Sequence, residues 1–225
     1  MGYRRKALVF LLVLCALGGA SAVAAPTCLS GTLASPYLTP SFSCMLGQFT
    51  AKTFFFSETS GGVSPNLISV SPIIGANQIG FQLTSNFTAT GSQSFTYVFS
   101  YFIDPPPPII RGQQIDLDPL GLVTLQTDLC AVAFPCPVLQ QLGTLNVNTG
   151  SPTAMQPLAL TNALGVQNTL TLNGGGGAAS SGGFDNITFL APEPSTILLA
   201  ACGLLGLFAY RFRSKFRQVL LQLRS

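Results

Sequence analysis

Hydrophobic and polar residues alternate with a period of two along much of the chain, which is the pattern of β-strands that bury one face. In residues 78–85, for example, Ile79, Phe81 and Leu83 fall on one side, and polar residues or glycine fall on the other. Similar patterns, or short apolar runs between turn residues, mark residues 49–57, 67–70, 94–103, 122–129, 138–147, 166–173 and 184–190. Roughly eight to ten short strands with no helix between them predict an all-β fold, an antiparallel β-sandwich of the jelly-roll type.

The first 24 residues have the three parts of a secretory signal peptide. Residues 4–6 are basic, residues 7–17 are apolar, and residues 18–25 are mostly small and contain Ala-Val-Ala at 22–24. An apolar run of eleven residues is short for a membrane span, which needs about 20. We therefore expect signal peptidase to remove residues 1–24 during export.

The C-terminal region combines an apolar run with a basic tail. Residues 196–210 carry no charge, and arginine and lysine become frequent directly after them. Since basic residues flank the cytoplasmic side of membrane helices, the sequence predicts a short transmembrane helix over about 196–212 and an extracytoplasmic middle region. The membrane-flanking basic residues are Arg211, Arg213, Lys215 and Arg217.

A motif with two prolines precedes the predicted membrane helix. Pro192 and Pro194 favour extended backbone around Glu193, and Ser195 can cap the helix that follows. An extended segment just outside the membrane is a form that a protease can bind through its main chain. The motif, the apolar run and the basic cluster together resemble the PEP-CTERM sorting signal of Gram-negative bacteria, a tail also labelled ice-binding protein C-terminal domain. This resemblance implies a membrane-anchored precursor that exosortase processes and passes to the cell envelope or exopolysaccharide matrix.

The start of the predicted exported region carries a second resemblance. It contains Cys-Leu-Ser-Gly-Thr-Leu-Ala at 28–34, a second cysteine at position 44 and a phenylalanine-rich segment after it. This stretch is similar to a group of bacterial PEP-CTERM proteins with β-rich surface domains, which implies export and fold but no activity. The expected organisation is a signal peptide at 1–24, an extracytoplasmic β-sandwich domain at 25–190 and a sorting and anchor segment at 191–225.

The predicted exported domain is acidic. Between positions 25 and 191 its basic residues are Lys52 and Arg111, against six acidic residues. A nucleic-acid-binding domain needs a basic patch, which two basic side chains cannot form. We therefore expect no nucleic-acid partner.

The same domain holds four cysteines, an even number that suggests two disulfide bonds in an oxidising compartment. Four cysteines allow three pairings, and we favour Cys28 with Cys44 and Cys130 with Cys136 because these are the closest pairs in sequence. A zinc site is the alternative, but the chain has neither a C-x-x-C pair nor any histidine. No metal and no cofactor are expected.

The absence of histidine excludes catalytic triads of the Ser-His-Asp or Cys-His kind. A glycosidase needs two carboxylates, and the close pair in this domain is Asp116 and Asp118, which would point to one face of a strand about 7 Å apart. The same pair could contribute to a calcium site. We favour the simpler interpretation that both are solvated residues near the end of a strand, and we expect no enzymatic activity.

These observations leave three hypotheses for function. The first is an exported protein, sorted by exosortase, with a non-catalytic structural or adhesive role in the cell envelope or exopolysaccharide matrix. The second is a carbohydrate-binding module for extracellular polysaccharide, and the third is a glycan hydrolase that uses Asp116 and Asp118. The expected partners are signal peptidase, exosortase, the membrane and exopolysaccharide.

Overall fold

The computed structural model describes residues 26–59, 61–104, 110–191 and 202–205. Twelve β-strands account for most of these residues, as the alternating pattern predicts. The strands are β1 (Gly31–Thr32), β2 (Ser43–Leu46), β3 (Phe49–Glu58), β4 (Ser69–Ile74), β5 (Gln78–Thr90), β6 (Ser94–Asp104), β7 (Ile110–Leu120), β8 (Leu122–Cys130), β9 (Gln141–Asn148), β10 (Thr153–Thr161), β11 (Leu164–Asn173) and β12 (Ala178–Leu190). Two 3₁₀ turns, η1 (Pro65–Leu67) and η2 (Val138–Gln140), lie between strands.

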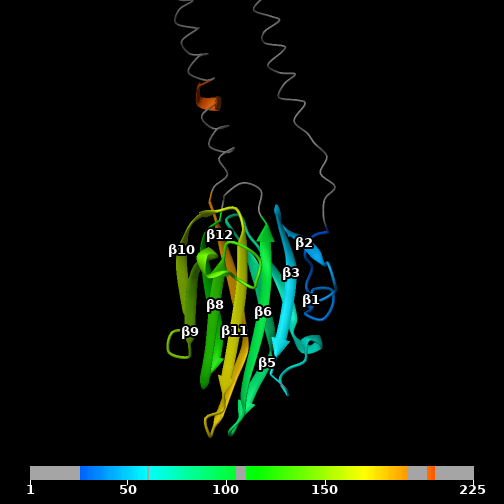
Figure 1. Cartoon of the computed structure of the whole chain (residues 1–225), viewed down its shortest axis with the longest axis vertical. Helices are drawn as coiled ribbons and strands as arrows, with labels where there is room; N and C mark the ends of the chain where they lie inside the picture. Colours follow the sequence, from blue (N-terminus) through cyan, green and yellow to red (C-terminus); the bar gives the residue numbers. More distant parts are fainter. Residues whose placement is uncertain (1–25, 60, 105–109, 192–201, 206–225) are drawn as a thin grey trace, which may run out of the picture.

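The strands form two six-stranded antiparallel sheets that face each other (Figure 1). The first sheet has the order β1-β4-β5-β12-β7-β10, and the second has the order β2-β3-β6-β11-β8-β9. The predicted all-β sandwich is thus confirmed. From β5 onward the orders 5-12-7-10 and 6-11-8-9 are those of a jelly roll, in which most connections cross from one sheet to the other.

The core lies between the sheets, where the inward side chains of both are buried. Ile79, Phe81 and Leu83 are each at most 1% exposed, on the side that the alternation predicts. Phe81 packs edge to face against Tyr101 of β6, with ring centroids 5.0 Å apart, and against Tyr37, at 5.8 Å. Aromatic pairs of this geometry add stability beyond the area that they bury.

A buried hydrogen-bond network joins the sheets at the centre of this core. Asn186 of β12 accepts hydrogen bonds from the Tyr101 hydroxyl, at 3.1 Å, and from the Gln113 amide, and its own amide donates to Asn168 of β11. Thr127 of β8 also donates to the Asn168 carbonyl oxygen, at 2.7 Å. Because buried polar groups are costly unless they are paired, this network fixes how one sheet sits on the other.

Some strands were not expected from the sequence. Strand β10 was not predicted, and β7 was anticipated only as the strand end that carries Asp116 and Asp118. Residues 173–183 are rich in glycine, a composition typical of a strand connection, yet the turn extends only to residue 177 and β12 begins at Ala178. Small residues are required there because the backbones lie close together: a Cβ atom on Gly183 would lie 2.1 Å from the Leu83 carbonyl oxygen.

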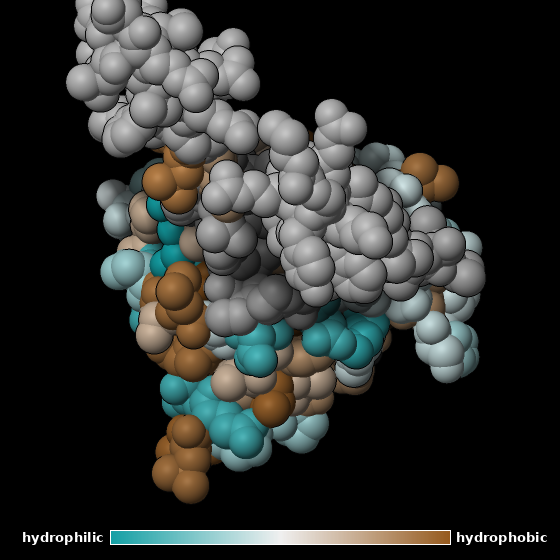
Figure 2. All heavy atoms as spheres, turned by 90° about the horizontal axis from the view of Figure 1, so that it is seen from above, coloured by the Kyte–Doolittle hydropathy of each residue, from teal (hydrophilic) through white to brown (hydrophobic). Residues whose placement is uncertain are grey.

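Residues 26 and 191 lie at the same end of the sandwich (Figure 1). At this end hydrophobic and hydrophilic side chains both reach the surface (Figure 2). The predicted signal peptide, the motif Pro192 to Ser195 and the basic cluster from Arg211 to Arg217 lie outside the described residues. Of the predicted membrane helix, residues 202–205 are described and are helical. Within the described part of the chain, no helix combines the length and the apolar character that a membrane crossing requires.

Candidate functional site

Two disulfide bonds are present, in the pairing that the sequence favoured. Cys28 is bonded to Cys44, with Cα atoms 4.8 Å apart, and Cys130 is bonded to Cys136, with Cα atoms 5.9 Å apart. Disulfide bonds are typical of proteins that fold in an oxidising compartment. The first bond lies near the N-terminal edge of the second sheet, whereas the second closes a short loop at the end of β8.

The Cys130–Cys136 loop lies beside the outward face of the second sheet. Its cysteines are six positions apart, so the disulfide closes a tight loop that contains Phe134. The Ala131 amide donates to the Gln140 carbonyl oxygen at 2.8 Å, which holds the two ends of the connection to β9 together. The loop is therefore fixed both covalently and by the backbone.

A groove of about 410 Å³ lies between this loop and the sheet. Its floor is polar and comes from strands β8, β9 and β11, whereas its wall is mostly apolar and comes from the loop and from η2. The floor residues are Gln126, Asp128, Gln141, Thr144 and Gln167, and the wall residues are Phe134, Pro135, Cys136 and Val138.

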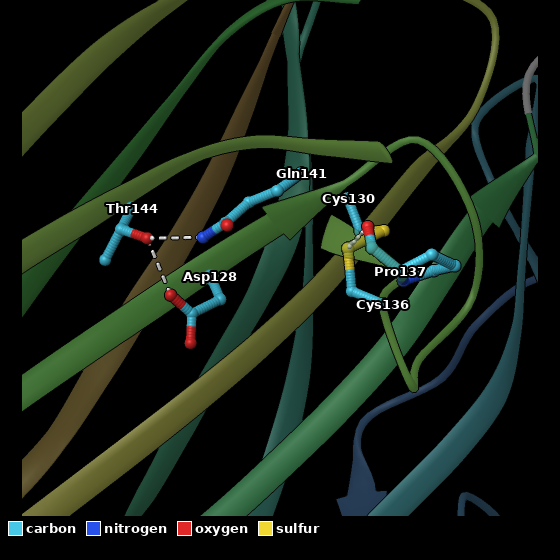
Figure 3. The surroundings of a disulfide bond; sticks show 6 residues. All are labelled: Asp128, Cys130, Cys136, Pro137, Gln141 and Thr144. Atoms are coloured by element: carbon cyan, nitrogen blue, oxygen red, sulfur yellow. Dashed lines mark hydrogen bonds between the residues drawn. A yellow bond between two sulfur atoms is a disulfide. The ribbon is translucent and has the colours of Figure 1, made fainter. Parts of the chain in front are cut away.

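Hydrogen bonds fix the orientation of the floor side chains. Asp128 accepts from the Gln126 amide, at 3.1 and 2.9 Å to its two oxygens, and from the Thr144 hydroxyl at 2.7 Å. Gln141 donates to the same hydroxyl at 3.1 Å (Figure 3). The amide nitrogens of both glutamines face Asp128 or Thr144, which leaves their carbonyl oxygens as acceptors for a ligand.

The wall of the groove exposes apolar surface. Val138 is 87% exposed, its neighbour Leu139 is 99% exposed, and the Phe134 ring is half-buried at the groove. A concave site with an apolar wall and a few oriented polar groups is the usual form of a small-ligand site. The arrangement can hold a molecule that has both hydroxyl groups and apolar faces.

A second hollow, of about 220 Å³, lies on the outward face of the first sheet. It contains Asp116 and Asp118 of β7, which lie on one face as expected, and also Asp185 of β12. Asp185 stands directly opposite Asp116 in the strand register, a pairing that was missed because the two are far apart in sequence. Gln114 donates to Asp116 at 2.8 Å.

The environment of Asp185 raises its pKa. Partial burial is the main cause, and the negative charge of Asp116 adds to it, although a hydrogen bond from Gln82 acts in the opposite direction. Within the part of the chain that the structure describes, no three His, Cys, Asp or Glu side chains are grouped so that they could hold a metal ion.

No protein-family model and no curated protein matches the chain. Among solved structures, the carbohydrate-binding module TmCBM61 in complex with β-1,4-galactotriose is 11% identical, with a TM-score of 0.35, over 59% of this chain and 86% of that one. The family 11 carbohydrate-binding module from Clostridium thermocellum, in complex with a mixed-linked tetrasaccharide, is 12% identical, with a TM-score of 0.31, over 62% and 90%. The enzymatically active domain of tailspike protein 4 from bacteriophage CBA120 is 11% identical, with a TM-score of 0.31, over 61% and 19%. Likenesses this weak assign neither a family nor a ligand to this chain.

Proposed function

We propose that this chain is an exported protein of the bacterial cell envelope or extracellular matrix that binds polysaccharide without cleaving it. The binding site is the groove beside the Cys130–Cys136 loop. The observation that carries the proposal is the combination, in one groove, of the apolar Phe134 and Val138 wall with the oriented polar floor around Asp128.

The chemistry of the groove suits a sugar. Each sugar ring has hydroxyl groups around its edge and C–H groups on its faces. The carbonyl oxygens of Gln126 and Gln141 can accept hydrogen bonds from hydroxyl groups, and a C–H face can pack against Phe134. Ligands without hydroxyl groups would leave the floor unpaired, which costs free energy when polar groups lose water.

The disulfide bonds support export, and the C-terminal sequence is the basis for proposing sorting. The motif Pro192-Glu193-Pro194-Ser195, followed by an apolar run and a basic tail, is the feature that would direct exosortase processing. Mass spectrometry of the mature protein from its host should find an N-terminus near residue 25 and a C-terminus near the motif. Recovery of the intact 225-residue chain as the mature form would overturn this part of the proposal.

Binding is tested by comparing two phenylalanine substitutions in the full chain, purified in a detergent without a sugar headgroup. Phe134→Ala removes the groove wall, and we expect at least about a tenfold loss of affinity for the glycans that the unmodified chain binds on an array. Phe55→Ala is the matched control, because Phe55 is 53% exposed on β3, on the same sheet but outside the groove. The proposal fails if the unmodified chain binds no glycan, or if both variants keep its affinity.

The glycan-hydrolase alternative is favoured by one observation, the grouping of Asp116, Asp118 and Asp185 in one hollow, where partial burial raises the pKa of Asp185. Glycosidases pair a protonated carboxyl group with an ionised one, and a carboxyl group whose pKa is raised is suited to the protonated role. Incubation of each bound polysaccharide with the chain should release no new reducing ends. Release that disappears in the Asp116→Asn/Asp118→Asn variant would establish the hydrolase in place of a binding protein.

A further inference from the structure

We infer that the groove is one end of a longer binding track along β8 and β11, and that its ligand is an interior segment of a neutral, extended polysaccharide. This inference rests on the proposed function and specifies the ligand of the same face. It is carried by a further hollow on the second sheet, by the strand register between this hollow and the groove, and by the distribution of charge.

A third hollow lies on the second sheet, at the other end of the same two strands. Its volume is about 530 Å³, and its lining includes Leu122 and Thr124 of β8 and Thr171 and Asn173 of β11. The groove beside the disulfide loop uses Gln126 and Asp128 of β8 and Gln167 of β11. The two hollows are therefore built on consecutive parts of one strand pair.

Four cross-strand pairs of outward side chains, here called rungs, run from the groove to the further hollow. Every second residue of a strand points to the same face, so the rungs follow from the register of β8 and β11. They are Asp128 with Gln167, Gln126 with Thr169, Thr124 with Thr171, and Leu122 with Asn173. Six residue steps along β8 span about 20 Å, which is long enough for several consecutive sugar rings.

The turns at the far end are held in place by hydrogen bonds. The Thr149 hydroxyl donates to the Gly121 carbonyl oxygen, and the Gly175 amide donates to the Asn173 side chain at 3.0 Å. The Leu122 side chain, 63% exposed, packs close to Gly175, where an added Cβ atom would lie 2.8 Å from Leu122 Cδ1. The track thus has a positioned apolar residue at each end, Phe134 and Leu122, with amide and hydroxyl groups between them.

The residues of the track include no basic side chain that could bind an anionic polymer. Among its rungs Asp128 is the charged residue, and it already accepts hydrogen bonds from Gln126 and Thr144. The described residues include two basic side chains, and both are unsuitable: Lys52 is bound to Asp104 at 2.7 Å, and Arg111 belongs to the first sheet. A neutral polymer is the ligand that this surface can bind without leaving charges unpaired.

The test compares ligand lengths on the full chain in a detergent without a sugar headgroup. The probes are the disaccharides and hexasaccharides of β-1,4-glucan, β-1,4-mannan and β-1,4-galactan, with hexagalacturonate as the anionic probe. By titration calorimetry we expect one neutral hexasaccharide to bind at least about tenfold more tightly than its disaccharide, and hexagalacturonate not to bind. The Leu122→Ala/Thr171→Val variant should lose this length advantage while it keeps disaccharide affinity.

The control is Leu120→Ala, a leucine that is 71% exposed at the same turn but belongs to the first sheet; this variant should keep the length advantage. If Phe134→Ala weakens binding but disaccharide and hexasaccharide bind equally, the proposed function stands and the track is refuted. Tighter binding of hexagalacturonate than of the neutral hexasaccharides refutes the neutral ligand. If the chain binds a glycan on the array but none of these hexasaccharides, the track is refuted and the proposed function stands; if it binds no glycan at all, both fail.

Discussion

The two disulfide bonds are expected to differ in what their removal costs: loss of one should mainly lower stability, and loss of the other should mainly lower the affinity for glycan. The Cys28–Cys44 bond joins positions 16 apart, and the Cys130–Cys136 bond joins positions 6 apart. In the chain-entropy treatment, the longer loop contributes about 3 kcal/mol to the free energy of unfolding and the shorter loop about 2 kcal/mol. If the short loop also positions the groove wall, removal of the Cys130–Cys136 bond should lower the stability less than removal of the Cys28–Cys44 bond, but it should lower the affinity for glycan more.

The perturbation is a pair of double variants, Cys28→Ala/Cys44→Ala and Cys130→Ala/Cys136→Ala, compared by denaturant unfolding and by glycan titration. In the second variant Phe134 must be ordered again when a ligand binds, and each immobilised side chain costs about 0.5–1.5 kcal/mol before any backbone term. We therefore expect at least about a tenfold loss of affinity. The first variant should lose more stability and bind normally.

The comparison separates positioning from general loss of structure, because the less stable variant is the one expected to bind. Equal affinities of the two double variants would refute the positioning role of the short loop. Loss of binding in the Cys28→Ala/Cys44→Ala variant alone would show that the site lies elsewhere, nearer the N-terminal edge of the second sheet.

Three further predictions concern the fold. Because the folded-state pKa of Asp185 is raised, its carboxyl group favours folding below the ordinary pKa and loses that contribution as the pH rises through the folded-state pKa. Asp185→Asn should therefore raise the unfolding temperature at pH 7 but not at pH 3. An equal gain at both pH values would contradict this. Asn186→Ala leaves several buried partners unpaired and should cost about 3 kcal/mol or more in denaturant unfolding, whereas a cost below about 1 kcal/mol would show that the network does not hold the sheets. Gly80→Ala would place a Cβ atom 1.8 Å from the Asn186 carbonyl oxygen and should prevent folding. Gly91→Ala meets open space at φ 58° and should cost only about 1–2 kcal/mol of stability. Similar circular dichroism melting curves for the two variants would contradict the close contact at Gly80.

The sequence allowed the fold class to be predicted because period-two alternation directly reflects burial in a sandwich. It failed where that pattern is interrupted. In β7 the buried Gln113 stands among apolar core positions, since the internal network needs it. In β10, Pro157 suggests a loop, yet an edge strand tolerates proline because one side of its backbone is unpaired.

Individual site residues were harder to predict than strands. Asp116 and Asp118 could be placed on one face from their spacing alone, but Asp185 joins them only through the β12–β7 register. The groove depends on the same kind of long-range pairing, because Gln126 and Gln167 meet only where β8 lies next to β11. A polar residue in an alternating strand predicts an outward side chain, but it does not identify the neighbours of that side chain.

The acidic residues of the domain leave one part of its surface nearly free of charge. Asp116, Asp118 and Asp185 share the hollow of the first sheet, whereas the central strands β8 and β11 of the second sheet carry Asp128 alone among their outward residues. The net negative charge therefore repels anionic polymers from the domain as a whole, while the outward residues of β8 and β11 include one charged residue. A neutral polysaccharide is the extracellular polymer that can approach such a domain without electrostatic cost and meet hydrogen-bonding groups when it arrives.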